Sequence, residues 1–317
     1  MKPLLLTGAT GFIGQRLQKA LLGNGQKVTA LVRRSSAHGA RLLPGVNCRQ
    51  ADLSDSEILA PAVSGAEAVI YCAGSVRGRQ LDDFRPANIA GVRSMVDAMN
   101  LAGTGVPLLL VSSLAASRPH VSDYANSKFL GEQQVREHAS FPWTIFRPPA
   151  VYGPGDKEML PILKLAMKGL VTPTGPIEQR LSLIHVDDLA SAVLAWLQSR
   201  DQCRGRVFTL DDGHSGGYNW QEIAETASPG GYRRVNIPAW LLSGVAGLNL
   251  SLSRLLRYHP MLTPGKAREL TQADWVCNNS DLSAATGWAP EIDLEQGLST
   301  LFGPSGNRQN DKSGDTN

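Results

Sequence analysis

The segment TGATGFIG at residues 7–14 decides the fold, because it joins a short apolar run to an amphipathic stretch. Residues 3–7 are expected to form a β-strand, and residues 12–22 have the spacing of a helix. A glycine turn between a strand and a helix N-terminus is typical of a site for dinucleotide phosphates. The spacing Gly-x-x-Gly-x-x-Gly differs from the commoner Gly-x-Gly-x-x-Gly fingerprint.

Each glycine of this turn has an expected task. Gly8 allows the sharp turn, Gly11 lets the backbone approach a pyrophosphate, and Gly14 lets the helix pack closely on the sheet. The helix N-terminus adds free N–H groups and the positive end of a dipole. The residues of this turn that we expect to contact the cofactor are Thr7, Gly8, Thr10, Gly11, Phe12, Ile13 and Gly14.

The alternation of apolar runs and helical segments continues beyond this turn. Further strands are expected at 28–32, 68–72, 108–112 and 143–147, and further helices at 55–63, 87–101 and 124–138. Continuous apolar strands alternating with helices indicate a parallel sheet covered on both faces. Right-handed crossovers then give an α/β fold with a doubly wound parallel sheet of the Rossmann type.

The pattern changes after residue 147. Prolines and glycines crowd residues 148–176, two more strands are expected at 181–186 and 207–210, and the remainder is mostly helical. We therefore expect a dinucleotide-binding domain and a smaller, mostly helical C-terminal substrate domain. The first comprises residues 1–150 and about 181–210, the second comprises 151–180 and 211–302, and 303–317 form a disordered tail.

Composition narrows the class of protein. The chain has 317 residues, 42% of them hydrophobic, with 31 basic and 28 acidic residues and a net charge of +3. This balance is too mild to indicate nucleic-acid binding. The four cysteines lie far apart without a Cys-x-x-Cys pair, so no metal site is expected. The apolar run at the N-terminus is too short for a signal peptide, and we expect a cytoplasmic protein.

Residues 237–256 form the most apolar later stretch. A proline, two glycines, an asparagine and several serines interrupt it, so it is not expected to span a membrane. Contact with a membrane surface stays open, but a buried amphipathic helix is favoured. Together with residues 260–270, this stretch suggests a hydrophobic rather than a sugar-lined substrate pocket.

The end of the second strand bears on the choice of cofactor. An NAD site usually has an acidic residue there for the ribose hydroxyls, whereas this chain has Arg33 and Arg34. Two guanidinium groups can pair with a 2′-phosphate, which favours NADP over NAD, although a solvated basic loop is the alternative. Asp52 follows a presumed third strand, which lies between the strands expected at 28–32 and 68–72. It is placed either to accept from an adenine amino group or to cap the next helix.

Eight motifs in order carry a family resemblance. They are TGATGFIG, ADL at 51–53, YCAG at 71–74, NIAG at 88–91, VSSL at 111–114, YANSK at 124–128, RPPAVYGPGD at 147–156 and IHVDDLA at 184–190. The chain resembles the extended short-chain dehydrogenase/reductases, often labelled NAD-dependent epimerase/dehydratases. The segment at 262–290 is more loosely similar to the branch that holds 3β-hydroxysteroid dehydrogenases and dihydroflavonol reductases.

This resemblance implies a proton-transfer pair, Tyr124 and Lys128, which share one face of a helix because they lie four positions apart. Lys128 is expected to lower the pKa of the phenol and to hold the nicotinamide ribose. Ser113 would hydrogen-bond the reacting oxygen, with Ser112 as an alternative. Asn88 would support the lysine through a water, or serve capping and packing instead.

The resemblance also extends the expected cofactor site and limits the chemistry. The remaining residues expected at the cofactor are Leu53, Cys72, Ala73, Gly74, Arg147 and Pro148. Only 11 residues separate Ser113 from Tyr124, fewer than in nucleotide-sugar epimerases, whose connecting loop helps to wall the substrate site. Residues 114–116 lack the acidic pair of the 4,6-dehydratases, which disfavours elimination chemistry.

Three functions remain in competition. The first is an NADP(H)-dependent oxidoreductase that interconverts a carbonyl and an alcohol on a small molecule with an apolar part. The second is a nucleotide-sugar 4-epimerase with retained NAD, and the third is a non-catalytic cofactor-binding structural or regulatory protein. The intact set of Ser113, Tyr124 and Lys128 argues against the third. The substrate, the direction of reaction and a possible homodimer are left open.

Overall fold

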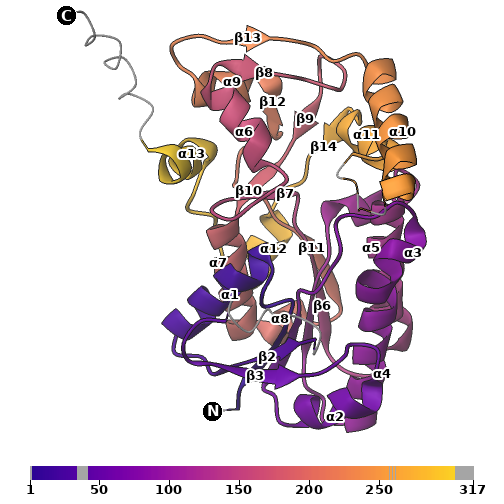
Figure 1. Ribbon diagram of the computed structural model, residues 1–317. Helices are drawn as coiled ribbons and strands as arrows, with labels where there is room; N and C mark the ends of the chain where they lie inside the picture. The colour runs from indigo at the N-terminus through magenta and orange to yellow at the C-terminus, as the bar shows by residue number, and fades with distance from the viewer. Residues whose placement is uncertain (1, 34–41, 257, 259, 261, 304–317) are drawn as a thin grey trace, which may run out of the picture.

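A computed structural model describes residues 2–33, 42–256, 258, 260 and 262–303. Its main feature is a seven-stranded, entirely parallel sheet with the order β11-β6-β5-β4-β1-β2-β3. The sheet lies in the lower part of the molecule as Figure 1 draws it. Its strands are β1 (Leu4–Thr7), β2 (Val28–Val32), β3 (Val46–Gln50), β4 (Ala68–Tyr71), β5 (Leu108–Val111), β6 (Trp143–Arg147) and β11 (Arg206–Thr209). Four of the strands, β1, β4, β5 and the inner part of β6, are fully buried, as continuous apolar runs require.

Helices cover both faces of this sheet. One face carries α1 (Phe12–Gly23) and α7 (Val186–Gln198), and the other carries α2 (Ser56–Ser64), α4 (Gly91–Ala102) and α5 (Asp123–His138). Each face has its own apolar core, because side chains of a strand alternate between the two faces. The doubly wound α/β prediction is confirmed. The boundaries of the sheet strands and of their covering helices agree within one or two residues, except that α4 begins at Gly91 where a helix was expected from residue 87.

A second, smaller lobe follows the carboxyl end of β6. Its strands are β7 (Ala150–Tyr152), β8 (Leu170–Val171), β9 (Arg180–Leu181), β10 (Leu183–His185), β12 (Tyr218–Asn219), β13 (Arg233–Arg234) and β14 (Asp274–Trp275). Its larger helices are α6 (Leu160–Met167), α9 (Trp220–Ala227), α10 (Ala239–Leu256), α11 (Pro264–Leu270) and α13 (Leu294–Phe302). The short helices α8 (Arg200–Cys203) and α12 (Ser280–Thr286) pack together beside β11 at the edge of the main sheet.

The expected strand at 181–186 is the main correction to the predicted topology. It is divided at Ser182, whose hydroxyl accepts from the Cys277 N–H and donates to the Cys277 carbonyl. β9, before this point, pairs with β12 and β14, while β10, after it, pairs with β7. Among the described residues after β6, only β11 joins the main sheet. An apolar run reports burial but not the partner strand, so the sequence did not reveal this division.

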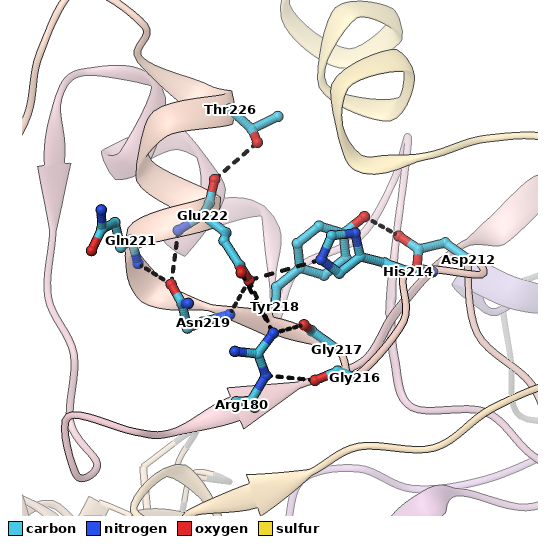
Figure 2. A network of polar contacts seen from close by, with 10 residues as sticks. All are labelled: Arg180, Asp212, His214, Gly216, Gly217, Tyr218, Asn219, Gln221, Glu222 and Thr226. Carbon is cyan, nitrogen blue, oxygen red and sulfur yellow. Dashed lines mark hydrogen bonds and ion pairs between the residues drawn. The ribbon is translucent and has the colours of Figure 1, made fainter.

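A polar network fixes the second lobe at the start of α9 (Figure 2). The Arg180 guanidinium on β9 donates to the Gly216 and Gly217 carbonyl oxygens at 2.6 and 2.7 Å. Asn219 and Glu222 form a reciprocal capping box at the first turn of the helix. These bonds satisfy backbone groups of the loop before α9, so the polar side chains gathered there have a structural role.

The stretch at 237–256 was expected to be buried, and the structure corrects this expectation. It forms α10, which buries only a narrow stripe including Leu242 and Ala246 and leaves most of its large apolar side chains exposed. Among the described residues, no helix combines the length and apolar character needed to cross a membrane. The expected disordered tail, from residue 304 onward, lies outside the described residues.

Candidate active site

The glycine turn at residues 7–14 lies at the carboxyl end of β1, at the centre of the sheet. Gly8 has φ of +67°, and a Cβ there would lie 2.6 Å from the Cys72 carbonyl oxygen. A Cβ on Gly14 would lie 2.1 Å from the Gly8 carbonyl oxygen. Both positions therefore require glycine, the first for its backbone conformation and its contact with the end of β4, the second for the closeness of α1 to the turn.

Thr7 ties this turn to the neighbouring strand. Its hydroxyl oxygen accepts from the Cys72 and Ala73 N–H groups at 3.1 and 3.0 Å. The ends of β1 and β4 are therefore held together at the point where α1 begins. Gly11 is the N-cap of α1, no side chain caps the helix, and its first turn holds no acidic residue. This end of α1 thus offers N–H donors and a positive dipole to an anion.

A basic residue, Arg33, follows β2, and an acidic residue, Asp52, lies near the end of the neighbouring strand β3. Arg33 is exposed and its charge lowers the pKa of Asp52, after the larger effect of hydrogen bonds from Ser54. Asp52 does not cap the following helix, because Asp55 accepts from the first N–H groups of α2. The capping alternative for Asp52 is therefore excluded. Arg34 lies outside the described residues.

Tyr124 lies in the first turn of α5, after the N-cap Ser122. Its phenol is partly buried, which raises its pKa, and a hydrogen bond with the Ser113 side chain acts in the opposite direction. Ser113 follows β5 and begins the 3-10 helix Leu114–Ser117, accepting from the Ala115 N–H. The structure thus brings together the phenol and the serine that the sequence paired.

Ser112, the alternative serine, has a different role. Its hydroxyl donates to the buried carboxylate of Glu132 on α5 at 2.6 Å. The same carboxylate accepts from both Nε and Nη2 of Arg147, at 2.9 and 2.6 Å. Ser112 and Arg147 therefore join β5 and β6 to α5, and Ser113 is the serine that faces Tyr124. Arg147 was expected near the cofactor, and the structure places its guanidinium in this ion pair.

Lys128 lies one helical turn after Tyr124 and is buried. Its Nζ donates to the Val111 carbonyl oxygen at 2.9 Å, and burial lowers the pKa of the ammonium to about 8. A Cβ on Gly74 would lie 3.9 Å from this nitrogen. Lys128 therefore stands between the ends of β4 and β5, at the same edge of the sheet as the glycine turn.

Asn88 lies in a short π-helical segment, Pro86–Ala90, which interrupts the expected helix at 87–101. Its side-chain amide donates to the Ser127 hydroxyl and to the Ser75 carbonyl, and its oxygen accepts from the Ser75 N–H. Asn88 thus fixes the loop after β4 against α5, beside Lys128. Single π-helical turns of this kind are frequent at functional sites.

Two residues that sequence reasoning missed, Lys266 and Glu269, close the site from the other lobe. The Lys266 ammonium on α11 forms an ion pair with Glu269 at 3.0 Å, and Glu269 accepts a short hydrogen bond from Ser122. Glu269 raises and Lys266 lowers the pKa of Tyr124, whereas Lys128 donates to Val111 instead. The available signal was the pair of charges at 266 and 269 within a stretch interpreted as apolar.

A cavity of about 130 Å³ lies between these residues and Tyr124. Its lining combines apolar with charged side chains, rather than being uniformly apolar. The apolar members include Val76, Phe84, Leu250 and Pro260, and the charged members are Arg79, Asp123, Lys266, Arg268 and Glu269. The lobe after β6 therefore meets the sheet domain at Tyr124, and both contribute walls to one cavity.

The remaining expected residues line the same edge of the sheet. Leu53 follows β3, the Cys72, Ala73 and Gly74 backbone follows β4, and Pro148 follows β6, its carbonyl accepting from the Leu114 N–H at 2.8 Å. In doubly wound sheets a ligand binds beyond the carboxyl ends of the strands. At Gly11 a Cβ would lie 3.3 Å from the Gly8 carbonyl oxygen and near no other described group, so the backbone there is open to the close approach of a pyrophosphate. Fold and site together define a Rossmann-type nucleotide-binding protein.

The chain belongs to the NAD dependent epimerase/dehydratase family, whose sequence model matches residues 4–210. A ceramide reductase of Caulobacter vibrioides is 35% identical over 88% of this chain and 87% of its own length. A 2-alkyl-3-oxoalkanoate reductase of Stenotrophomonas maltophilia is 26% identical over 94% and 98%. The solved UDP-glucose 4-epimerase of Thermotoga maritima shares the fold, with a TM-score of 0.69, 20% identity and coverage of 94% and 96%. The protein is therefore an NAD(P)-dependent enzyme with a nicotinamide cofactor.

Proposed function

We propose that this enzyme is an NADP(H)-dependent oxidoreductase that interconverts a ketone and a secondary alcohol on a lipid-like substrate. The observation that carries the proposal is the position of Tyr124. Its phenol contacts Ser113 beside the cofactor cleft and lines the cavity that α11 closes. A substrate in that cavity would have its reacting oxygen between a phenol and a hydroxyl.

A bound nicotinamide supplies or accepts the hydride, and the side chains of the chain manage the proton. In reduction, the Tyr124 hydroxyl gives its proton to the carbonyl oxygen while the Ser113 hydroxyl donates a hydrogen bond to the same oxygen. In oxidation, the Tyr124 phenolate takes the proton of the alcohol. Lys266 favours the phenolate and Glu269 disfavours it. Lys128 would hold the nicotinamide ribose from its place between the ends of β4 and β5.

The substrate class rests on the lining of the cavity and on the two relatives. The names of the relatives state a ceramide and an alkyl-substituted 3-oxo acid as substrates. A cavity of about 130 Å³ accommodates a ketone and its immediate neighbours, but not a long chain. Phe84, Leu250 and Pro260 offer an apolar exit for that chain, while Lys266 and Arg268 face polar groups near the ketone. We therefore propose a ketone that carries at least one long alkyl chain.

A direct assay tests this function. The purified enzyme is given NADPH or NADH together with a long-chain 3-oxo lipid in detergent micelles, and oxidation of the nucleotide is followed. The reaction expected is stoichiometric formation of the alcohol. If UDP-glucose is instead converted into UDP-galactose without added nucleotide, the enzyme is an epimerase and the proposal is wrong.

The preference for NADP(H) rests on Arg33 and Arg34 and has its own test. Replacing both with Ala should weaken NADPH binding by roughly 1.5–3 kcal/mol for each charged hydrogen bond lost. Binding of NADH should change little, because NADH lacks the 2′-phosphate. Calorimetric titration of the parent enzyme and of the double variant, each with NADPH and with NADH, measures these affinities. Equal affinity of the parent enzyme for NADH and NADPH would remove the argument.

A further inference from the structure

The exposed side of α10 is a continuous apolar surface. The α10 apolar face consists of Trp240, Leu241, Val245, Leu248, Leu252 and Leu256. Trp240 is 76% exposed, Leu248 72% and Leu256 62%, which is far above the usual exposure of such residues. At 100° per residue these six positions fall within one arc of about 160°, and the buried Leu242 and Ala246 lie just beyond one end of that arc. Figure 1 shows α10 at the outer edge of the molecule, with α11 on its inner side.

The chain around this face is strongly basic. Residues 226–268 contain six of the 31 basic residues and none of the 28 acidic ones. The rest of the chain holds 25 basic and 28 acidic residues, so this segment alone makes the net charge positive. Arg233 and Arg234, both exposed, form β13 and lead into the helix. An apolar helix face flanked by arginines is the composition of a helix that lies in a membrane interface.

Two occupants would cover the α10 apolar face, a second copy of the chain or a lipid surface. A second copy would bring two such segments together, and apart from Lys266, which pairs with Glu269, each segment holds five basic residues and no acidic residue. An anionic lipid surface offers apolar depth to the leucines and negative headgroups to the arginines at the same time. We propose that the α10 apolar face docks on the surface of an anionic phospholipid bilayer.

Docking in this way would place the candidate active site next to the bilayer. Leu250, on the inner side of α10, lines the cavity that holds Tyr124, and α11 packs against α10 and supplies Lys266. A substrate with a long alkyl chain could then present its ketone to Tyr124 without leaving the lipid phase entirely. This last step rests on the proposed function. Docking itself rests only on the α10 apolar face and on the basic residues of the segment 226–268.

Co-sedimentation with vesicles tests the proposal. The full-length protein is mixed with vesicles of phosphatidylcholine alone and of phosphatidylcholine with phosphatidylglycerol. We expect binding to the mixed vesicles only, and a loss of roughly tenfold or more in Leu248→Glu. The matched control is Leu101→Glu, because Leu101 on α4 is 66% exposed and lies outside the face. Arg233→Glu with Arg234→Glu should weaken binding by roughly fivefold or more for each charge.

Each result decides the proposal. Equal binding of Leu248→Glu and the parent, or no binding of the parent to either vesicle, would overturn it. Ultracentrifugation showing a parent dimer that Leu248→Glu converts into a monomer, without vesicle binding, would assign the face to a second copy instead. Reductase activity on a short, water-soluble ketone reports the proposed function separately. That activity should be the same in Leu248→Glu and the parent, and its absence in both would leave the vesicle result unaffected.

Discussion

The glycine turn at residues 7–14 and helix α10 lie at opposite extremes of packing. At the turn, an added Cβ on Gly14 would meet backbone at 2.1 Å, whereas α10 leaves Trp240 and Leu248 mostly exposed. The turn is defined by its own backbone and by strands that pack directly against it. α10 is held along one stripe only, so its other face is available to a partner. Under the proposed function, cofactor recognition would depend on the rigidly packed turn, and contact with the substrate's surroundings would depend on the second lobe.

Tyr124 stands where the sheet domain meets the second lobe, in a cavity that Leu250 of α10 also lines, and replacing it should have the largest effect. In Tyr124→Phe, turnover should fall by roughly 10²–10⁴-fold, the usual contribution of a positioned proton donor. Cofactor binding should be nearly unchanged, because the ring still packs beside Phe84. Steady-state kinetics on a reducible ketone and calorimetry with NADPH measure the two quantities.

The control for this change is Tyr232→Phe, since Tyr232 lies in the second lobe and does not line the cavity. Its turnover should equal that of the parent. If Tyr124→Phe also retains most of the parent's turnover, the phenol is not the acid–base, and the meeting of the two regions at this residue has no catalytic meaning.

The tight packing of the turn predicts the next largest effect. Gly14→Ala forces a methyl group against the Gly8 carbonyl and should destabilise the protein by about 1–3 kcal/mol while weakening cofactor binding. Gly23→Ala, in the same helix and with no atom near the added methyl, should be neutral or stabilising by up to about 1 kcal/mol. Denaturant unfolding measures both. Similar losses in the two variants would contradict the packing argument.

The buried ammonium of Lys128 carries a cost to stability. Its folded pKa of about 8 lies below the ordinary value of 10.5, so below pH 8 the folded protein holds a disfavoured ammonium. Lys128→Met should lose turnover, yet raise the free energy of unfolding of the cofactor-free protein by about 1–2 kcal/mol after the loss of the bond to Val111.

The sign of the pH dependence follows from linkage. Between pH 8 and 10.5 the unfolded chain binds more protons at Lys128 than the folded one, so stability rises with pH in this window. The advantage of Lys128→Met over the parent should therefore be largest below pH 8 and shrink above it. Thermal unfolding across this range measures it, with the exposed Lys164→Met as control. A difference that does not vary with pH would refute the buried ammonium as its source.

The smallest effect is expected from the charges that the second lobe brings to Tyr124. Lys266 lowers the pKa of the phenol and Glu269 raises it. In Lys266→Met the pH profile for alcohol oxidation should move to higher pH, and in Glu269→Gln it should move to lower pH. Shifts of both variants in the same direction, or no shift in either, would show that α11 shapes the cavity without tuning the phenol.

How far the sequence could predict the site depends on how local the cause is. The three glycines, the strand before them and the helix after them lie within 20 residues, and their roles follow from backbone sterics that no distant contact changes. The doubly wound sheet was predictable for a similar reason, since buried parallel strands need continuous apolar runs. Tyr124 and Lys128 share a helix face by spacing alone.

What only the tertiary structure decided involves partners far apart in the chain. The Glu132 carboxylate accepts hydrogen bonds from Ser112 and Arg147, so Ser113 rather than Ser112 is the serine that faces Tyr124. Ser122 meets Glu269 across 147 residues, which brings α11 over the phenol. Likewise, the apolar character of α10 was evident in the sequence, but its exposed side was not. The hydrophobicity of a residue indicates that its burial is favourable. Which residues it packs against depends on shapes and hydrogen bonds that exist only after the chain has folded.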